Sequence, residues 1–233
     1  MAKIVFGQGV AVMRGKLGGS IFSQNKGGNY IKNYNTPTNP QTAKQLAVRS
    51  LFSSISTAYS SLTSGQKDSW KSWAETLPWI NNVGEEFYLS GKGLFQKANL
   101  PLRNVGIAML SECPDDFESP SAIQGFSIVV GATSQDIVVT SDDSTVPANT
   151  TFVVDGAVMN NGARANNNSL FKRITSIAAS AAFDTADLGS VYAAVFGAFS
   201  IGQTIELRAQ AVNNLNGMVS PYLKASTVVV TGT

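Results

Sequence analysis

The sequence predicts an α+β protein in which a helical region precedes an all-β domain. Apolar residues recur at three- and four-residue steps between residues 42 and 77, whereas after residue 126 they alternate with polar residues in short runs. Between the two patterns, Pro, Ser and Asp gather at residues 111–125. We therefore expect four regions: an extended Gly-rich basic arm at 1–38, a helical region at 39–110, a linker at 111–125 and a β-sandwich at 126–233.

The first two helices are expected at about residues 42–62 and 64–77. Thr42 can cap the first helix, and Thr63 and Gln66 have the spacing of a capping box, so the second helix follows directly. An apolar stripe follows the helical period of the first helix and must be covered by a neighbour. Its members are Val48, Leu51, Phe52, Ile55, Ala58, Tyr59 and Leu62.

A third helix is expected at about residues 91–100, where Ser90 can cap its start and Pro101 should end it. The segment from Pro78 to Phe87 is expected to be a loop. Three tryptophans lie in or beside the first helical pair, and we favour core packing for them over an aromatic platform for a sugar or a partner. They are Trp70, Trp73 and Trp79.

The arm at residues 1–38 is rich in Gly and Asn and contains short apolar alternations that suit an extended segment or loose hairpins ordered on a neighbour. Its run Gly-Lys-Leu-Gly-Gly-Ser lacks the Gly-Lys-Ser/Thr ending of a phosphate loop, so nucleotide binding is not expected. Eight basic residues precede the first acidic one, Asp68, although the net charge is only +2. Such an arm can contact nucleic acid or an acidic protein surface; the alternative is a set of solvated side chains.

Six strand-like segments follow residue 126, separated by turns rich in Asn, Gly, Asp and Pro, and they predict a two-sheet sandwich. The Ala-rich segment at 178–199 leaves two options open: a short helical crossover, or a loop with a seventh strand at 191–195. The six segments are 126–130, 135–140, 151–155, 170–174, 204–212 and 224–230.

The residue types argue against catalysis. The chain has no histidine and one cysteine, Cys113, which precedes a proline and has no histidine to activate it. The carboxylate pairs Glu85-Glu86, Asp115-Asp116 and Asp142-Asp143 lack calcium-loop spacing, so they are interpreted as loop residues. We therefore expect no enzyme activity, no metal and no cofactor.

Charged residues make up only 14% of the sequence, while 43% is hydrophobic. This composition, below the roughly 25% charge of average soluble domains, suits surfaces that pack against other subunits. No apolar run approaches the roughly 20 residues that span a bilayer, and the first residues do not resemble a secretory signal. Synthesis in a cytosol without a membrane anchor is expected.

Three spaced motifs in the first half carry a resemblance. They are Asn39-Pro40-x-Thr42-x-x-Gln45-x-x-x-Arg49, Leu62-Thr63-x-x-Gln66-x-x-x-Trp70, and Leu89-Ser90-Gly91 followed by Leu94-Phe95 and Asn99. Together with Gly-Lys-Leu-Gly-Gly-Ser, they resemble a family of small structural proteins of tailed bacteriophages and prophages. The resemblance implies a virion component made in the bacterial host cytoplasm, without indicating a position in the particle.

The segment at 204–221 resembles the last hairpin of fibronectin type III-like sandwiches, because an alternating strand, an Asn-Gly turn and Ser-Pro follow one another. Residues 126–233 lack the tryptophan that this family carries in an early strand, and no tyrosine corner is evident. The resemblance therefore implies a divergent immunoglobulin- or fibronectin III-like sandwich.

These observations give one main functional hypothesis and two alternatives. The main hypothesis is a non-enzymatic, homo-oligomeric virion protein, a capsid auxiliary or decoration protein that contacts the major capsid protein through its N-terminal half and displays the sandwich. The alternatives are a tail or head-to-tail connector ring component, in which the arm can contact DNA, and a carbohydrate-binding adhesion module. Expected partner-binding residues are Gln45, Arg49, Tyr30, Arg14 and Lys16.

The carbohydrate-binding alternative depends on exposed aromatic rings in the sandwich. Residues 126–233 contain few aromatic residues, and most stand in apolar contexts typical of buried positions. They are Phe126, Phe152, Phe171, Phe183, Tyr192, Phe196, Phe199 and Tyr222.

Overall fold

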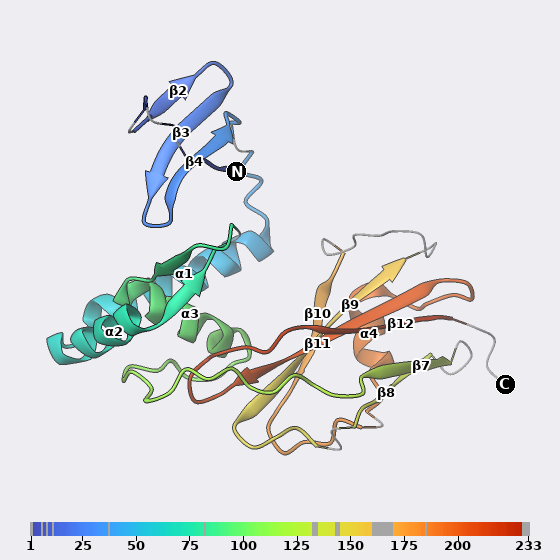
Figure 1. Ribbon diagram of the computed structural model, residues 1–233. Helices are drawn as coiled ribbons and strands as arrows, with labels where there is room; N and C mark the ends of the chain where they lie inside the picture. Colours follow the sequence, from blue (N-terminus) through green and yellow to red (C-terminus); the bar gives the residue numbers. More distant parts are fainter. Residues whose placement is uncertain are drawn as a thin grey trace. The chain divides into compact units, whose positions relative to one another are not determined.

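The computed structural model shows two compact units, each with its own core. The first unit holds residues 1–96 and 111–113, and the second holds residues 97–110 and 114–233. Helices and antiparallel sheets are both present, so the predicted α+β class is confirmed (Figure 1). The described residues are 2–5, 7, 9–10, 12–36, 38–81, 83–131, 135–142, 145–159, 170–184 and 186–229.

The N-terminal segment forms a four-stranded antiparallel sheet in the order β1-β4-β3-β2, where the sequence suggests an extended arm or loose hairpins. The glycines mark hairpin turns: Leu17 pairs with Ser20 across Gly18-Gly19, and Gly18 has a φ of 56° that suits glycine. Composition alone did not separate a glycine-rich arm from short strands joined by glycine turns. The strands are β1 (Ala2–Lys3), β2 (Gly15–Leu17), β3 (Ser20–Asn25) and β4 (Gly28–Asn33).

Helices α1 (Ala43–Ser61) and α2 (Ser64–Thr76) begin where the sequence predicts. At the start of α2, Thr63 Oγ1 accepts the Gln66 N–H at 3.3 Å and Gln66 Oε1 accepts the Thr63 N–H at 2.9 Å. Thr42 and Gln45 form the same reciprocal pair at α1, at 3.3 and 3.4 Å. Each box satisfies two amide donors that a helix start leaves without partners.

The segment after α2 is a short hairpin of β5 (Pro78–Ile80) and β6 (Glu86–Tyr88), so the prediction of a loop from Pro78 to Phe87 was wrong. Asn81 stabilises the connection, because its Oδ1 accepts the N–H groups of Val83 and Glu85. An Asx-type side chain that binds backbone two residues onward favours a tight turn.

Helix α3 (Gly91–Asn104) starts as predicted, with Ser90 Oγ accepting the Gly93 N–H at 3.2 Å. It continues through Pro101, so the predicted end at residue 100 was wrong. A proline inside a helix costs about 3 kcal/mol, because it removes one hydrogen bond and crowds the preceding turn. Leu102, fully buried with Val153 and Val212, offsets part of that cost.

The core of the first unit is an aromatic cluster. Trp70 on α2 meets Phe95 on α3 edge-on at 5.2 Å, and Tyr59 on α1 lies 5.3 Å from the same ring. Trp70 is fully buried, and its indole N–H donates to the Ser111 carbonyl at 3.1 Å. Core packing is therefore confirmed for Trp70, while Trp73 and Trp79 are half-buried.

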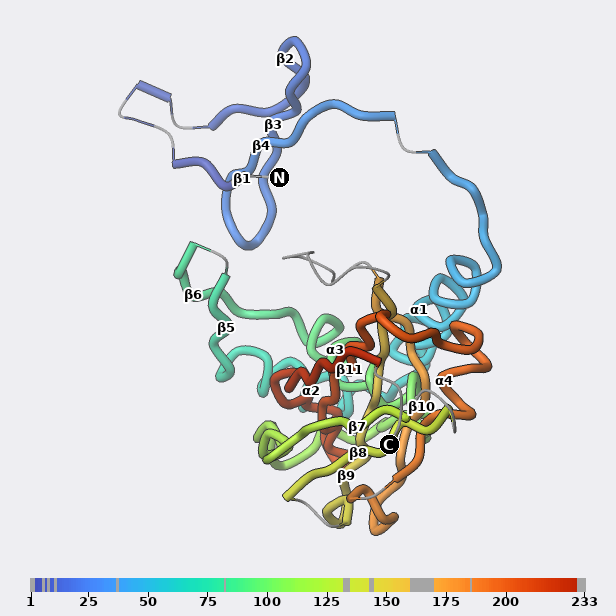
Figure 2. The backbone as a smooth tube through the Cα atoms, turned by 90° about the vertical axis from the view of Figure 1, so that its right-hand side faces the viewer, coloured from blue at the N-terminus to red at the C-terminus, as the bar shows by residue number. Residues whose placement is uncertain are grey.

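The second unit contains the predicted sandwich-like β structure in two antiparallel sheets. One has the order β10-β9-β11-β12 and the other is the β7-β8 hairpin; β9 and β11 run side by side in both views (Figure 1, Figure 2). The strands are β7 (Ser127–Gly131), β8 (Asp136–Thr140), β9 (Thr150–Met159), β10 (Lys172–Ile177), β11 (Thr204–Asn213) and β12 (Leu223–Val228).

Of the two options for the Ala-rich segment, the structure has the helix: α4 spans Gly189–Phe196. The suggested seventh strand at 191–195 is therefore absent. Leu188, Tyr192 and Phe196 recur at four-residue steps, and the Tyr192 and Phe196 rings stack at 4.7 Å. Tyr192 is fully buried, and burial raises the pKa of its hydroxyl.

The segment at 111–125, predicted to be a linker, has no helix or strand but is anchored at several points. Ile123 is 2% exposed in the core of the second unit, and Asn216 Nδ2 donates to the Glu118 carbonyl at 2.9 Å. Buried apolar surface and side-chain hydrogen bonds therefore fix this segment, although it has no regular secondary structure.

Gly217→Ala tests the packing of the turn between β11 and β12. Gly217 has a φ of 71°, and a Cβ there would collide with the Ala98 carbonyl oxygen. Gly202, with a φ of 85° and open space around it, is the matched control. We expect Gly202→Ala to lower the free energy of unfolding by about 1–2 kcal/mol from strain alone. Gly217→Ala should cost about 1–3 kcal/mol more from the collision. Calorimetry of the full chain measures both, and equal losses would contradict this packing.

Thr63→Ala tests the capping box of α2. Loss of the hydroxyl leaves an amide donor unsatisfied and should lower the stability of the first unit by about 1 kcal/mol. Urea unfolding followed by tryptophan fluorescence reports this unit selectively, because all three tryptophans belong to it. Thr57→Ala, at an exposed position inside α1, is the control and should be neutral or slightly stabilising. An unchanged midpoint for Thr63→Ala would exclude the capping role.

Candidate functional site

The first motif serves the start of α1. Gln45 completes the capping box with Thr42, and Arg49 Nη2 donates to Asn39 Oδ1 at 2.9 Å. Each of these two residues therefore has a contact at the start of its own helix, and their predicted binding of a partner stays a prediction. The three-residue spacing of Thr42 and Gln45 is that of a capping box.

The other two motifs also serve packing within the chain. Gln66 Nε2 donates to Glu112 Oε1 at 2.8 Å in addition to its capping role. At Gly91 a Cβ would lie 2.9 Å from the Lys71 backbone nitrogen, so only glycine allows α3 to start this close to α2. Asn99 is fully buried and bonds both backbone groups of Leu110.

The apolar stripe of α1 is covered over only part of its length. Ile55 is fully buried and Tyr59 packs on Phe95, as the stripe predicts. Phe52, one turn before Ile55, is 48% exposed, and Val48, two turns before Ile55, is 61% exposed. We call Val48 and Phe52 the open stripe. A continuous helical face that is buried at one end and exposed at the other is typical of a contact site for another chain.

A second candidate surface is one face of the N-terminal sheet. The register puts Lys16, Ile21 and Lys32 in one row across β2, β3 and β4, and Tyr30 lies in the row of Ser23 and Lys3. Because side chains alternate between the faces of a strand, both rows project from the same side. We call this side, with Lys3, Lys16, Tyr30 and Lys32, the basic face.

The predicted residues Lys16 and Tyr30 therefore share one surface. Lys16 Nζ lies 3.7 Å from the ring centroid of Tyr34, which orients the ammonium group. Arg14 Nη2 donates to Gln24 Oε1 at 2.8 Å beside β3. The structure thus ties Arg14, Lys16 and Tyr30 to the N-terminal sheet, and Gln45 and Arg49 to the start of α1.

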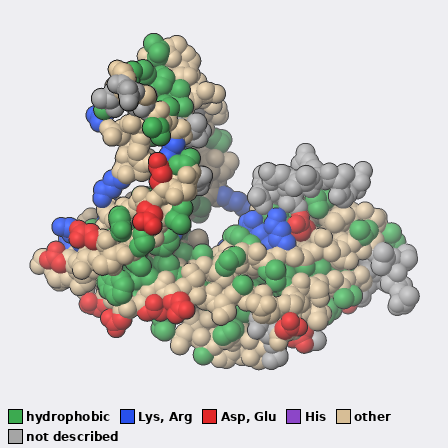
Figure 3. All heavy atoms as spheres, viewed as in Figure 1, with side chains coloured by type: hydrophobic (Ala, Val, Ile, Leu, Met, Phe, Trp, Pro, Cys, Tyr) green, Lys and Arg blue, Asp and Glu red, His purple; other side chains and the backbone are tan. Residues whose placement is uncertain are grey.

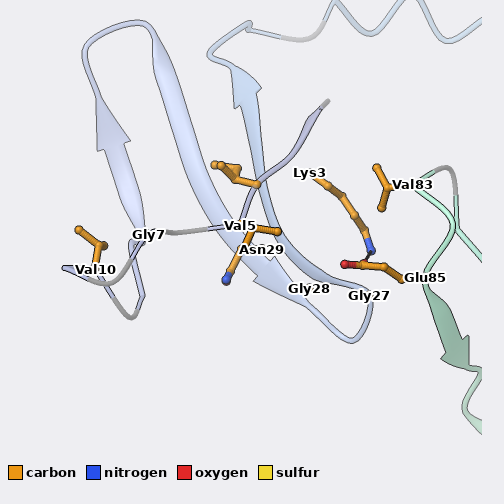
Figure 4. Close-up of a pocket in the computed structure, with 10 residues that line it drawn as sticks. Lys3, Val5, Gly7, Val10, Gly27, Gly28, Asn29, Val83 and Glu85 are labelled. Carbon is orange, nitrogen blue, oxygen red and sulfur yellow. Dashed lines mark hydrogen bonds and ion pairs between the residues drawn. The ribbon is translucent and has the colours of Figure 1, made fainter.

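A cavity of about 780 Å³ opens beside the end of β1. Lys3 and Glu85 point toward each other across it and form an ion pair at 3.2 Å (Figure 4). Asn29 Oδ1 is buried there without a hydrogen-bond partner among the described residues. The lining comprises Lys3, Ile4, Val5, Gly7, Val10, Gly27, Gly28, Asn29, Val83 and Glu85.

The groups around this cavity favour the ionised form of the Glu85 carboxyl. The pKa of the Glu85 carboxyl is lowered, first by a hydrogen bond from Asn81 and then by a hydrogen bond and the charge of Lys3. A carboxylate held ionised in this way is a poor general acid. Within the described ranges, no group of three or more His, Cys, Asp or Glu side chains is placed to hold a metal ion.

The predicted loop carboxylates and Cys113 do not converge on a site. Asp115 and Asp116 lie in the irregular segment, and Asp116 Oδ1 accepts the Glu118 N–H at 2.8 Å. Glu86 is exposed on β6, and Asp143 lies outside the described residues. Cys113 is half-buried in the first unit.

Sequence reasoning missed a charged cluster on the four-stranded sheet of the second unit. Asp155 on β9 is 5% exposed and accepts hydrogen bonds from Arg173 on β10 and Arg208 on β11. The three residues are far apart in sequence, so no local motif marks them. The sequence signal was the presence of charged residues inside three segments that were otherwise apolar or alternating.

Comparisons with known proteins identify no family for this chain. No family model matches the sequence, and no curated protein matches it. Among solved structures, a Fn3-like protein from Clostridium thermocellum is similar at 12% identity and a TM-score of 0.29. The match covers 50% of this chain and 99% of that one. In the described part of the chain, no helix is long and apolar enough to cross a membrane.

Proposed function

We propose that this chain is a non-enzymatic structural protein of a tailed-bacteriophage particle, a capsid auxiliary or decoration protein that is fastened through its N-terminal half. The observation that carries the proposal is the open stripe, where Val48 and Phe52 continue a helix face on which Ile55 is fully buried and Tyr59 packs against Phe95. The resemblance of the three motifs to small virion proteins supplies the kind of assembly.

The free energy that the open stripe can contribute is small compared with the cost of association. Full burial of an apolar side chain contributes about 1.5–3 kcal/mol, so half-exposed Val48 and Phe52 add on the order of 1 kcal/mol each. Association costs about 4–15 kcal/mol, which two side chains do not offset alone. The open stripe therefore requires further contacts, and a lattice that presents several neighbouring subunits supplies them.

The basic face supplies such a contact with an acidic partner. Lys16 and Lys32 are exposed on it, and no acidic residue precedes Asp68 in the sequence. Opposite charge on a neighbouring subunit would orient the N-terminal half during docking and accelerate association more than it adds affinity. A tail or connector ring is the competing position, and the copy number per particle distinguishes the two.

Immunogold labelling tests the proposal in the particle. Antibodies raised against the full chain should label intact virions of the phage that encodes it at many positions around the capsid. Label confined to the tail or the neck would place the chain in a ring. Virions that remain unlabelled by two independent antibodies, while the free chain is detected in the lysate, would overturn the virion role.

The variant Val48→Asp/Phe52→Asp tests the open stripe. Both side chains are exposed, so the melting temperature of the free chain should stay within a few degrees of wild type. Incorporation of the tagged chain into particles should fall at least tenfold, because two charges would be buried without partners. The matched control is Ser53→Asp/Thr57→Asp, two exposed positions on the other side of α1. Equal incorporation of both variants would exclude this face as the contact.

A further inference from the structure

The charged cluster of the second unit is a single row across the four-stranded sheet. The register pairs Arg173 with Asp155, Asp155 with Arg208, and Arg208 with Lys224, so consecutive strands β10, β9, β11 and β12 each place one charged residue in line. We call these four residues the charged row. Figure 3 shows basic and acidic side chains side by side over the β-rich part of the molecule.

The row lies on the face of the sheet that is turned away from the main core. The opposite face carries Phe152, Val154, Ile205 and Leu207, which are buried in that core. On the side of the row, Val153 and Val212 are covered by Leu102 near one end of the strands. Ala157, on the same face of β9 as Asp155, is also fully buried.

Asp155 fixes the two guanidinium groups. Arg173 Nε donates to Asp155 Oδ1 at 2.8 Å, and Arg208 Nε and Nη2 donate to Asp155 Oδ2 at 3.1 and 3.0 Å. The Asp155 side chain is 8% exposed, whereas that of Arg173 is 40% exposed. One buried carboxylate therefore holds two cations, and its bond to Arg173 uses the Nε of a side chain that is 40% exposed.

Aromatic rings hold Arg208 from both sides. Its guanidinium carbon lies 4.3 Å from the centroid of Phe171 and 4.3 Å from that of Tyr222. Cation–π contacts on both faces and Asp155 at the edge leave little rotational freedom. Preorganised donors lose less conformational entropy when a ligand binds, which is the usual property of a recognition site.

The surroundings combine an apolar ring with mixed polar groups. Tyr222 is 45% exposed, in contrast to Phe126, Phe152, Phe183, Tyr192 and Phe199, which are buried as the sequence predicts. Lys224 Nζ lies 4.0 Å from Glu206 Oε1. Ser226 on β12 is the register partner of Glu206 on β11. Donors, acceptors and an exposed ring therefore adjoin the arginine pair.

We propose that the charged row and Tyr222 form a binding site for an acidic saccharide, a sugar ring that bears a carboxylate. Arg173 and Arg208 bind the carboxylate, for which the planar guanidinium is suited. Tyr222 packs against the C–H face of the sugar ring, and Glu206 and Lys224 bind hydroxyl groups. A phosphate backbone fits less well, because Asp155 and Glu206 interrupt the positive charge and one exposed ring gives no stacking series. The site belongs to the second unit and does not depend on the virion role.

Binding of the full chain to immobilised polygalacturonate tests the site, with neutral dextran, poly-L-glutamate and oligo(dT) as parallel probes. We expect binding to polygalacturonate and none to dextran, because the carboxylate is required. Arg173→Gln should weaken the polygalacturonate interaction about tenfold, the loss expected for one charge-assisted contact. Tyr222→Ala should weaken it severalfold.

The control variant is Lys16→Gln/Lys32→Gln, which removes two charges from the basic face and should leave polygalacturonate binding unchanged. Melting curves check that every variant folds, and Arg173→Lys, which keeps the charge but loses the planar fork, should recover only part of the binding. The proposal is overturned if the lysine pair alone controls binding. It is also overturned if poly-L-glutamate or oligo(dT) binds as tightly as polygalacturonate with the same sensitivity to Arg173→Gln.

Discussion

The contact of Trp70 and Tyr59 with Phe95 determines what the N-terminal half buries and what it presents. The three rings come from three helices, and those of Trp70 and Tyr59 lie 5.2 and 5.3 Å from that of Phe95, so they fix how α1, α2 and α3 pack. Aromatic side chains bury large areas, and edge-on pairs add about 0.5–1.5 kcal/mol beyond that. The cluster contacts the C-terminal half of α1. The N-terminal half of the apolar stripe, with Val48 and Phe52, therefore stays exposed.

The elements that the sequence predicted well are those specified by nearby residues. The two capping boxes, the start of α3 and the alternation in β11 each depend on groups within a few positions of one another. A hydroxyl and an amide side chain at a three-residue spacing can each accept the other residue's backbone N–H at a helix start, so their pattern identifies that start. Burial of Trp70 and of the aromatic core in the second unit followed from the same periodicities.

The failures are those where distant residues decide the outcome. Pro101 is a local signal to end a helix, yet burial of Leu102 with Val153 and Val212 carries α3 onward. The Ala-rich segment had no decisive local preference, and α4 is selected by its four-residue spacing of Leu188, Tyr192 and Phe196 against a distant core. The charged row exists only after four strands adopt one register, since a slip of one residue would move its members to opposite faces.

The motif residues have roles in the helical scaffold. Thr42, Gln45, Thr63 and Gln66 cap helices, and Gly91 permits a close backbone approach, so a shared pattern at these positions specifies a shared helical scaffold. Partner binding by Gln45 stays a prediction beside this capping role. Phe52 of the open stripe and the charged row lie outside the motifs and provide further surfaces for partners. A shared pattern at these capping positions therefore argues for a shared fold and not for a shared partner.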